Sequence, residues 1–117
     1  MQPIYRSDGA TVAIVHCGYL YNRDGEWIGF LRGAEVYGSN GDYLGFLTED
    51  RRLLRTRRPP QQEPLPPPPF WPPRLRRVPE RFPLAPLFKQ LPFGLIDVFE
   101  EFPERFKYVS ELRPDLD

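Results

Sequence analysis

A pattern that recurs every 16 residues near the start of the chain limits its possible folds more than any other feature. In each copy an apolar residue precedes a tyrosine, and a glycine follows four positions after the tyrosine. The tyrosines are Tyr5, Tyr21 and Tyr37, and the glycines are Gly9, Gly25 and Gly41. A unit of 16 residues is too small to bury an apolar face by itself, so the units have to pack on one another.

Each unit is typical of a β-hairpin. The dipeptides Asp8-Gly9, Asp24-Gly25 and Asn40-Gly41 tolerate the positive φ that a two-residue turn requires, and short aliphatic and aromatic runs flank them. A fourth unit keeps only its first strand, because Leu53 and Arg57 stand where the aromatic residue and the glycine would fall. The repeat therefore predicts a mainly β fold, a meander of about seven short antiparallel strands that is pseudo-fourfold with an incomplete last repeat.

The alternation of side chains along the strands predicts which residues form the core. Three columns are apolar in every copy: Ile4, Leu20 and Val36; Val12, Ile28 and Leu44; Ile14, Phe30 and Phe46. A further column, Ala13, Gly29 and Gly45, is small in every copy. Glycine is unfavourable inside a strand unless a backbone or a ring approaches closely. We expect the units to pack around a common axis at that layer.

The full repeat is apolar-Tyr-x-x-(Asp/Asn)-Gly-x-x-apolar-Gly-apolar-apolar, and a proline-rich segment follows it. This pattern resembles the bacterial family of 4-fold beta flower proteins. The resemblance covers residues 1–58 through the repeat and residues 59–92 through composition. It implies four hairpins about a pseudo-fourfold axis and supplies no catalytic residues. The fourth unit, Glu49–Arg58, departs from the pattern because it lacks the turn glycine.

The middle of the chain is a proline-rich arm. Thirteen of the 16 prolines fall between Pro59 and Pro92, a density that favours a stiff polyproline II segment over helix or strand. Large apolar residues alternate with the prolines, which is unusual for a solvated linker. We therefore divide the chain into a repeat β-hairpin domain (1–58), an Arg-studded arm (59–92) and a tail (93–117).

The tail has the apolar spacing of helices. Apolar residues recur three or four positions apart from Leu95 to Leu112, and Pro103 interrupts the series. The pattern predicts two short helices, residues 95–101 and 103–112, with Pro103 at the first position of the second. Helices of this length need a surface to pack on.

We expect the arm and the tail to bind a protein, either a second copy of the chain or another one, and to act as a non-catalytic interaction or assembly module. The residues expected to carry this contact are Phe70, Trp71, Arg74, Arg76, Arg77, Phe82, Leu87, Phe88, Phe99, Phe102 and Phe106. Burial of the arm's large apolar residues, Leu84 among them, is expected to supply most of the docking energy.

Charge is sorted along the chain although the net charge is zero. Residues 1–50 hold 3 basic and 7 acidic side chains, residues 51–90 hold 10 and 2, and residues 91–117 hold 3 and 7. We expect Arg74, Arg76, Arg77 and Arg81 to face either the acidic turns of the β-domain or Glu100, Glu101 and Glu104 of the tail. A basic surface that is neutralised in this way makes nucleic-acid binding an unlikely function.

The sequence offers no catalytic, cofactor or metal residues. His16 and Cys17 are neighbours on a strand, so their side chains point to opposite faces and form no dyad. They are best explained as a turn histidine and a small buried thiol. One His and one Cys fit no zinc pattern. A ring of turn carboxylates (Asp8, Asp24, Glu26, Asp42) is possible, but turn chemistry already explains two of them.

An alternative function is the binding of a small aromatic or nucleotide-like ligand. Tyr5, Tyr21, Tyr37, Trp27 and Tyr43 would line the pocket, and Arg6, Arg23 or Arg32 would meet a phosphate. Repeated aromatic residues are more often packing residues, which is the favoured interpretation.

Two proline motifs match peptide ligands, Pro69–Arg74 for SH3-like grooves and Leu65–Pro69 for the EVH1 type. Composition alone produces such matches in a segment so rich in proline. We see neither a signal peptide nor an apolar run long enough to span a membrane, and we expect a cytoplasmic protein.

Overall fold

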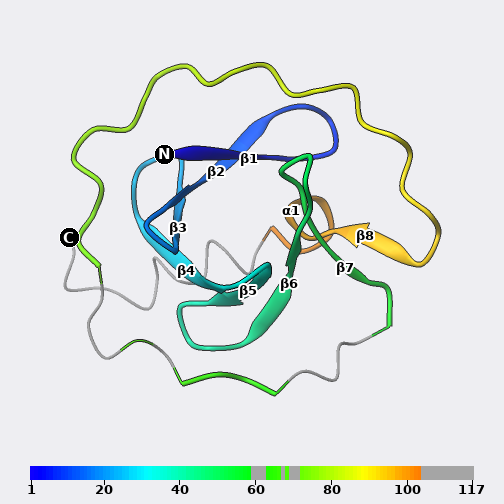
Figure 1. Cartoon of the computed structure of the whole chain (residues 1–117), viewed down its shortest axis with the longest axis horizontal. Coiled ribbons are helices and arrows are strands. Elements are labelled where there is room, and N and C mark those ends of the chain that lie inside the picture. Colours follow the sequence, from blue (N-terminus) through cyan, green and yellow to red (C-terminus); the bar gives the residue numbers. More distant parts are fainter. Residues whose placement is uncertain (59–62, 67, 69–71, 104–117) are drawn as a thin grey trace.

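The computed structural model describes residues 1–58, 63–66, 68 and 72–103. Within them a single antiparallel sheet pairs each strand with the next along the chain, which confirms the predicted meander. The strands are β1 (Gln2–Tyr5), β2 (Thr11–His16), β3 (Tyr19–Asn22), β4 (Trp27–Arg32), β5 (Glu35–Gly38), β6 (Tyr43–Leu47), β7 (Leu53–Thr56) and β8 (Leu95–Asp97). A short helix, α1 (Val98–Glu101), follows β8. The sheet curls into a ring (Figure 1).

The ring closes between β1 and the start of β7. The Tyr5 amide donates to the Arg51 carbonyl at 2.8 Å, and Tyr5 forms a parallel bridge with Arg52. Closure thus depends on Tyr5, at the end of β1, and on the two residues that precede β7.

The hairpin turns within the units are three-residue loops and not the two-residue turns predicted. The Gly9 amide donates to the Arg6 carbonyl at 2.8 Å, and the Arg6 amide donates to the Ala10 carbonyl at 2.8 Å. Equivalent bonds occur at Gly25 and Gly41. In each loop only the glycine has a positive φ, between 85° and 94°. Such a loop bulges the hairpin, and it needs glycine at the last loop position only.

A two-residue turn with positive φ at both positions occurs between two units instead. Cys17 (φ 53°) and Gly18 (φ 80°) join β2 to β3, where His16 pairs with Tyr19. Cys17 lies on this turn and is exposed, so the prediction of a buried thiol is wrong.

The fourth unit begins one residue late. Ile14 pairs with Tyr21 and Phe30 with Tyr37, but Phe46 pairs with Leu54 because the loop after β6 holds an extra residue. Leu54 therefore takes the tyrosine position, and Leu53 takes the position of the preceding apolar residue. The second strand of this unit is β8, which comes from the far end of the arm and pairs Leu95 with Thr56.

Strand β8 overturns the prediction of a helix over residues 95–101. Leu95–Asp97 is a strand, and the helix is limited to Val98–Glu101. The spacing of three and four between apolar residues could not predict this strand. The strand forms because the edge of β7 that is otherwise unpaired offers Leu95 and Ile96 a partner. The second predicted helix, 103–112, lies outside the described residues apart from Pro103.

The apolar side chains form two clusters. The axial core contains Ile4, Ala13, Leu20, Ile28, Val36, Leu44, Leu53, Val98 and Phe99. The outer aromatic layer contains Ile14, Tyr21, Trp27, Phe30, Tyr37 and Tyr43. The first two predicted columns belong to the axial core, with Val12 half-buried beside it. The third predicted column does not belong to the axial core. Ile14 and Phe30 lie in the outer aromatic layer, and Phe46 is half-buried.

The column of small residues at Ala13, Gly29 and Gly45 was expected to allow close packing at the common axis. The close approach of neighbouring strands explains its glycines better. A Cβ on Gly29 would lie 2.4 Å from the Tyr37 carbonyl oxygen, and a Cβ on Gly45 would lie 2.3 Å from the Leu54 carbonyl oxygen. A side chain at either position would push the next strand away.

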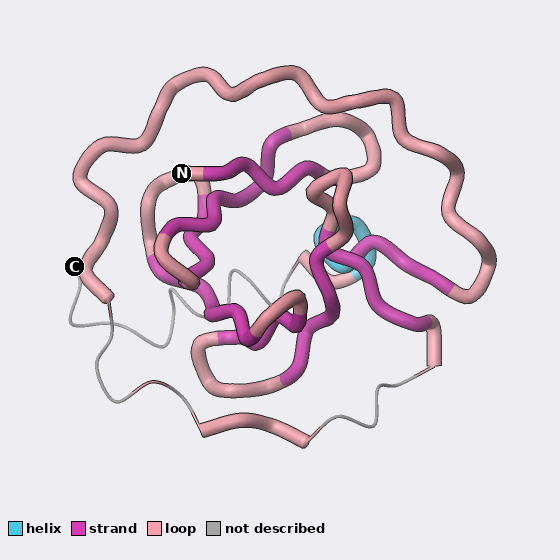
Figure 2. Tube along the Cα trace, viewed as in Figure 1, coloured by secondary structure: helices cyan, strands magenta, loops and turns pink. Residues whose placement is uncertain are grey.

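The arm encircles the ring. Its described residues, 63–66, 68 and 72–94, lie around the outside of the hairpins, and the last of them lead into β8 (Figure 2). Its two ends meet where the Arg57 amide donates to the Gly94 carbonyl at 2.9 Å. The arm is therefore a closed loop inserted into the fourth hairpin.

The arm contacts one hairpin turn in every ten residues. The Leu65 amide donates to the Gly41 carbonyl at 2.9 Å, and the Leu75 amide donates to the Gly25 carbonyl at 3.0 Å. Ten residues further on, the Ala85 methyl lies 4.0 Å from where a Cβ of Gly9 would be. The arm thus meets the third, second and first turns in that order.

Around these contacts the inward-facing residues that the structure describes come in groups with a spacing of three, and a step of four separates one group from the next. The half-buried arm residues of this kind are Leu65 and Pro68; Pro72, Leu75 and Val78; Phe82, Ala85 and Phe88. The described residues between them are exposed. A period of three is that of the polyproline II helix, so one of its three faces lies against the ring.

Prediction: Gly41→Ala should destabilise the protein more than Gly9→Ala. Both glycines have nearly the same φ, 94° and 92°, so the backbone strain is matched. A Cβ at Gly41 would lie 1.9 Å from the Leu65 carbonyl oxygen, whereas at Gly9 the nearest atom is 4.0 Å away. We expect an extra loss of about 1–2 kcal/mol in unfolding free energy from the displaced arm contact. Urea denaturation measures it, and equal losses would contradict the contact.

Candidate functional site

The strongest candidate for a functional surface is the arm together with the hairpin rim that it covers. We call the turns at Gly9, Gly25 and Gly41 and the outer aromatic layer the docking rim. Leu65, Leu75, Val78 and Phe82 of the arm pack against the aromatic layer. The rim thus combines backbone carbonyls, the space left by glycine, and a floor of rings.

The five aromatic residues considered as a ligand pocket are buried. The exposed fraction of their side chains is 4% for Tyr5, 3% for Tyr21, 0% for Trp27, 7% for Tyr37 and 9% for Tyr43. Two of their polar groups form hydrogen bonds within the protein. The Tyr5 hydroxyl donates to the Pro83 carbonyl at 2.7 Å, and the Trp27 indole N–H donates to the Gly29 carbonyl at 2.6 Å. Burial raises the pKa of Tyr21 and, with an added hydrogen bond to Glu35, of Tyr43. A small ligand would reach these rings only if the arm left the rim.

The centre of the ring also has no room for a ligand. The space between Ile4, Leu20, Val36 and their neighbours is apolar and holds no volume that a water molecule could occupy. Two of the arginines considered for phosphate contact are engaged elsewhere. Arg6 pairs with Asp8 at 2.7 Å, and Arg23 donates to the Thr11 carbonyl at 3.1 Å, while Arg32 is exposed.

Arginines of the β-domain stack on phenylalanines of the arm and tail. The Arg52 guanidinium lies 4.5 Å from the centre of the Phe88 ring, and Arg57 lies 4.5 Å from Phe93. Arg55 covers Phe102 at 4.4 Å, and Arg23 covers Phe82 at 5.5 Å. Such contacts contribute about 0.5–2 kcal/mol each, depending on their exposure.

This arrangement differs from the predicted one, in which arginines of the arm face carboxylates. Within the described residues the ion pairs are Arg6–Asp8 and Arg52–Asp50, both inside the β-domain. Arg74 donates to the backbone carbonyl of Asp24 at 3.1 Å and not to its carboxylate. Arg76, Arg77 and Arg81 are exposed. Exposed ion pairs contribute little, so docking of the arm does not need them.

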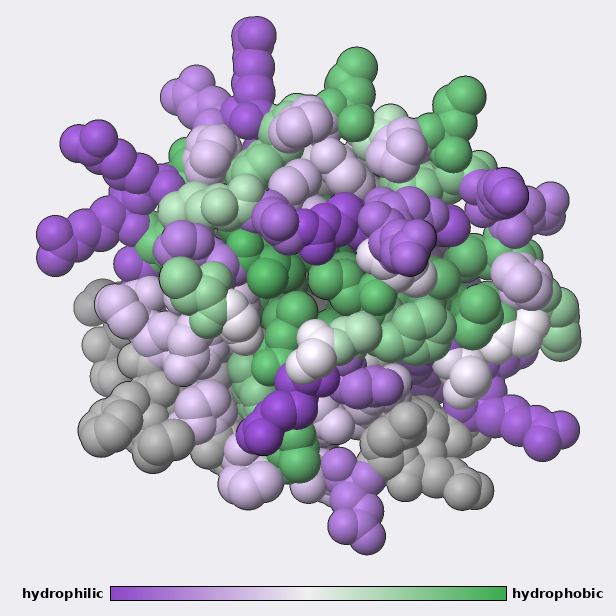
Figure 3. Space-filling model, viewed as in Figure 1, coloured by the Kyte–Doolittle hydropathy of each residue, from purple (hydrophilic) through white to green (hydrophobic). Residues whose placement is uncertain are grey.

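The outer face of the arm carries apolar side chains in solvent. Leu84 is 95% exposed, Leu87 103% and Phe93 83%. Apolar side chains project from the rim of the molecule in Figure 3. Leu84 and Leu87 are three residues apart, so they lie on one face of a polyproline II helix. Leu84 and Leu87 therefore do not help the arm to dock on its own β-domain, because that face of the arm is turned away from the ring, and their burial against a partner stays a prediction.

The residues expected to carry a partner contact thus separate into groups. Phe82 and Phe88 face the ring, Phe99 is in the axial core, and Phe102 packs beside it. Arg76, Arg77 and Leu87 face solvent, and Arg74 is held at the second turn. Phe70, Trp71 and Phe106 lie outside the described residues.

The peptide-ligand motif Leu65–Pro69 has its leucine turned inward. Leu65 bonds to Gly41 and packs on the aromatic layer, so the motif is not free for another domain while the arm is docked. Of the motif Pro69–Arg74 the structure describes the last residues only.

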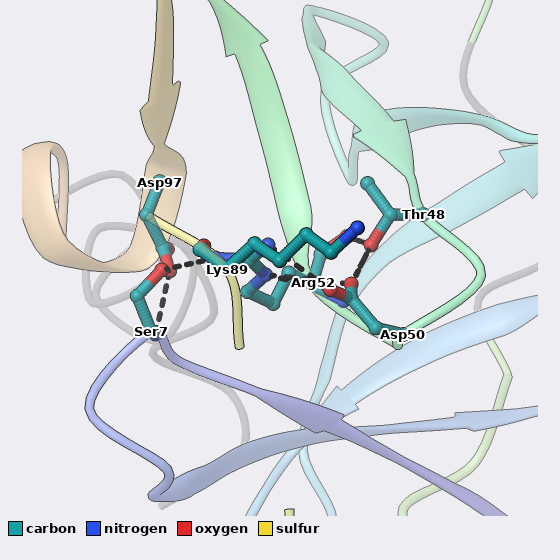
Figure 4. A network of polar contacts seen from close by, with 6 residues as sticks. All are labelled: Ser7, Thr48, Asp50, Arg52, Lys89 and Asp97. Atoms are coloured by element: carbon teal, nitrogen blue, oxygen red, sulfur yellow. Dashed lines mark hydrogen bonds and ion pairs between the residues drawn. The ribbon is translucent and has the colours of Figure 1, made fainter. Parts of the chain in front are cut away.

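A network of hydrogen-bonded side chains, Ser7, Asp50, Arg52 and Asp97, joins the ends of the ring, and we call it the polar seam. Ser7 of the first turn donates to the Asp97 carboxylate through its amide (2.8 Å) and its hydroxyl (2.7 Å), as Figure 4 shows. The other carboxylate oxygen accepts the Phe99 amide at 3.0 Å and caps α1. Arg52 donates to Asp50 and, at 3.3 Å, to the Ser7 hydroxyl. Asp97 is 2% exposed, so the seam is a buried network that fixes β8 to the first hairpin.

Three acidic groups in or near the seam, Asp50, Glu100 and Asp8, have shifted pKa values. Burial would raise the pKa of Asp50, but hydrogen bonds from Thr48 and Arg52 outweigh it and lower that pKa. Burial, followed by the charges of Asp97 and Asp8, raises the pKa of Glu100. The hydrogen bond from Arg6 lowers the pKa of Asp8. A cavity of about 530 Å³ opens beside these groups, between the arm's last residues and α1.

The turn carboxylates considered as a ring do not converge. Asp8 pairs with Arg6, and Asp42 accepts from the Asn40 amide group at 3.1 Å, each within its own hairpin turn. In the part of the chain that the structure describes, no cluster of three or more His, Cys, Asp or Glu residues suits a metal ion. The same part contains no helix with the length and apolar character of a membrane span.

Sequence reasoning missed the residues that hold the arm in register. They are Leu65, Leu75 and Ala85, and the signal that reveals them is their spacing of ten, which Leu95 of β8 continues. A second series, Pro68, Val78, Phe88 and Val98, has the same period. The period of 16 ends with the β-domain, and the period of ten belongs to the arm.

Comparison with known proteins identifies the repeat region. Residues 2–55 match the family model described as 4-fold beta flower protein, which confirms the resemblance read from the repeat. No curated protein and no solved structure matches the chain. The matched residues contain β1 to β6 and nearly all of β7, so the arm, β8 and α1 lie beyond them.

Prediction: Asp97→Ala should cost far more stability than Ser7→Ala. The first change leaves the amides of Ser7 and Phe99 and the Ser7 hydroxyl without their buried acceptor. We expect a loss of about 2–4 kcal/mol for Asp97→Ala and about 1 kcal/mol for Ser7→Ala, which keeps the Ser7 amide bond. Urea denaturation compares them, and a loss for Asp97→Ala no larger than that for Ser7→Ala would contradict the seam.

Prediction: Glu100→Gln should stabilise the protein at neutral pH. The folded state disfavours the charged carboxylate, so its raised pKa lowers stability above that pKa. The advantage of the variant should shrink as the pH falls through the raised pKa and vanish below the unfolded value of about 4.5. Thermal midpoints from pH 8 to pH 4 measure this, with Glu63→Gln as a control for loss of an exposed charge. An advantage that does not change with pH would contradict the account.

Proposed function

Since residues 2–55 belong to the 4-fold beta flower protein family, and an arm with exposed apolar side chains surrounds this β-domain, we propose that the chain is a non-catalytic protein–protein interaction or assembly module. Its contact surface is the outer face of the arm at Leu84 and Leu87. The partner is a protein, either a second copy of the chain or another one.

The observation that carries this proposal is the exposure of Leu84 (95%) and Leu87 (103%) on a fixed backbone. Single exposed apolar residues are normal on protein surfaces. Here two leucines share one face of an extended segment, and the opposite face is anchored through Phe82, Ala85 and Phe88. The backbone between the anchors is already ordered, so a partner that covers both leucines loses little conformational entropy.

Polyproline II segments are well suited to such a contact. They are stiff, lack internal backbone hydrogen bonds, and present side chains three residues apart along each face. Pro83 and Pro86 are exposed next to the two leucines. Partners that bind such segments use grooves lined with aromatic residues.

Prediction: the double variant Leu84→Asp/Leu87→Asp should lose association while keeping the fold. If both leucines become buried in the contact, at about 1.5–3 kcal/mol each, association should weaken at least about 100-fold. The thermal midpoint should barely change, since both side chains already lie in solvent. Light scattering over a concentration series measures association between copies of the chain. Quantitative affinity capture with the full chain measures binding of another protein.

The control is Gln90→Asp, which adds one of the two negative charges three residues beyond Leu87, at an exposed polar position. It should leave association intact. A wild-type chain that stays a 13.8 kDa monomer and captures no protein would contradict the proposal, as would equal association by the double variant.

A further inference from the structure

The docking rim holds the arm in the same way at successive hairpins. At the third and second hairpins an arm leucine donates its amide to the carbonyl of the turn glycine, at 2.9 Å for Leu65 and 3.0 Å for Leu75. Three residues after each leucine another half-buried residue follows, Pro68 and Val78. The two contacts are ten residues apart in the arm and 16 residues apart in the ring, so each hairpin binds one ten-residue segment of the arm.

Each contact has a receptor side that is independent of the arm's own sequence. The turn carbonyl accepts a hydrogen bond, glycine leaves room for the arm backbone, and the buried rings form an apolar floor. At Gly25 a Cβ would lie 2.9 Å from the Leu75 carbonyl oxygen and 3.2 Å from the Leu75 Cβ. These features recognise an extended backbone with apolar residues three apart, which is the geometry of polyproline II.

From this repetition we infer that each of these hairpins is a binding subsite for a polyproline II segment, and that the arm of a second copy of the chain can occupy it. The subsites at Gly25 and Gly41 share the hydrogen bond from a leucine amide and the close approach of the arm backbone, and Arg74 adds a bond to the Asp24 carbonyl at the second turn. The shared features recognise backbone and spacing, so they do not restrict either subsite to the segment that fills it in the folded chain. A segment with the spacing of residues 72–82 satisfies both.

The chain's own arm competes strongly with any such segment. Both ends of the arm are fixed to the ring, because Thr56 pairs with Leu95 and the Arg57 amide bonds to Gly94. A tethered segment of this kind acts at an effective concentration on the order of millimolar. A second arm therefore gains access when the first is weakened or when the protein is highly concentrated.

This inference concerns the inner face of the arm and the turn glycines, whereas the proposed function concerns its outer face. Variants of Leu84 and Leu87 leave the subsites unchanged, and glycine variants leave the outer leucines unchanged. The two ideas can therefore fail separately.

The test uses the full chain with its arm weakened by Leu65→Asp/Leu75→Asp and a fluorescent synthetic peptide of residues 72–90 as the probe. Fluorescence anisotropy should show binding to this variant at least about 10-fold tighter than to the wild type, whose subsites are filled. Adding Gly25→Ala and Gly41→Ala to the variant should abolish binding. Adding Gly9→Ala should not, because that glycine has no arm backbone within 4 Å.

The aspartates place charge beside the aromatic layer, so a milder variant, Leu65→Ala/Leu75→Ala, is measured in parallel, with near-ultraviolet circular dichroism to confirm the fold. Binding by either folded variant that depends on Gly25 and Gly41 supports the inference. Absence of binding to both at millimolar peptide overturns it, as does binding that the two glycine substitutions do not change.

Discussion

The arm backbone passes closer to the hairpin turns than any side chain on those turns would permit. At Gly41 a Cβ would lie 1.9 Å from the Leu65 carbonyl oxygen, and at Gly25 it would lie 2.9 Å from that of Leu75. These glycines therefore serve twice: they supply the positive φ of a three-residue loop, and they leave the space in which the arm lies. This close approach places Leu65 and Leu75 against the aromatic layer.

The length of the arm matches the ring that it surrounds. Ten residues of polyproline II extend about 31 Å at about 3.1 Å per residue. A circle whose diameter lies between the two longer extents of the molecule, 40 and 35 Å, has a circumference of about four times that length. Ten residues then cover roughly a quarter of the circle, which is why the arm meets successive hairpins at a spacing of ten. The fourth hairpin has no turn glycine because its turn is the arm itself.

The repeat of 16 residues was enough to predict the meander, its first seven strands and the apolar columns, because side-chain alternation and turn glycines are local signals. Strand β8 could not be predicted in this way, since its pairing with β7 depends on an arm that returns to its starting point. The charge pattern suggested ion pairs between arm arginines and acidic turns. The structure instead has Arg52 and Arg57 of the β-domain on Phe88 and Phe93, a contact that follows from proximity in the fold and not from the sorting of charge. The inward-facing residues of the arm could have been predicted from the spacing of ten between Leu65, Leu75 and Ala85. The exposure of Leu84 and Leu87 could not, because it depends on which face of the arm meets the ring.

Amide hydrogen exchange by NMR tests the register of the arm most directly, because the amides of Leu65 and Leu75 bond to the turns. The docked arm predicts that both amides exchange far more slowly than in an unfolded peptide. The amides of Arg76 and Arg77, which have no acceptor among the described residues, should exchange at rates close to those of the peptide. Exchange of the Leu65 and Leu75 amides at unfolded-peptide rates, in a chain whose β2 and β4 amides remain protected, would contradict the account.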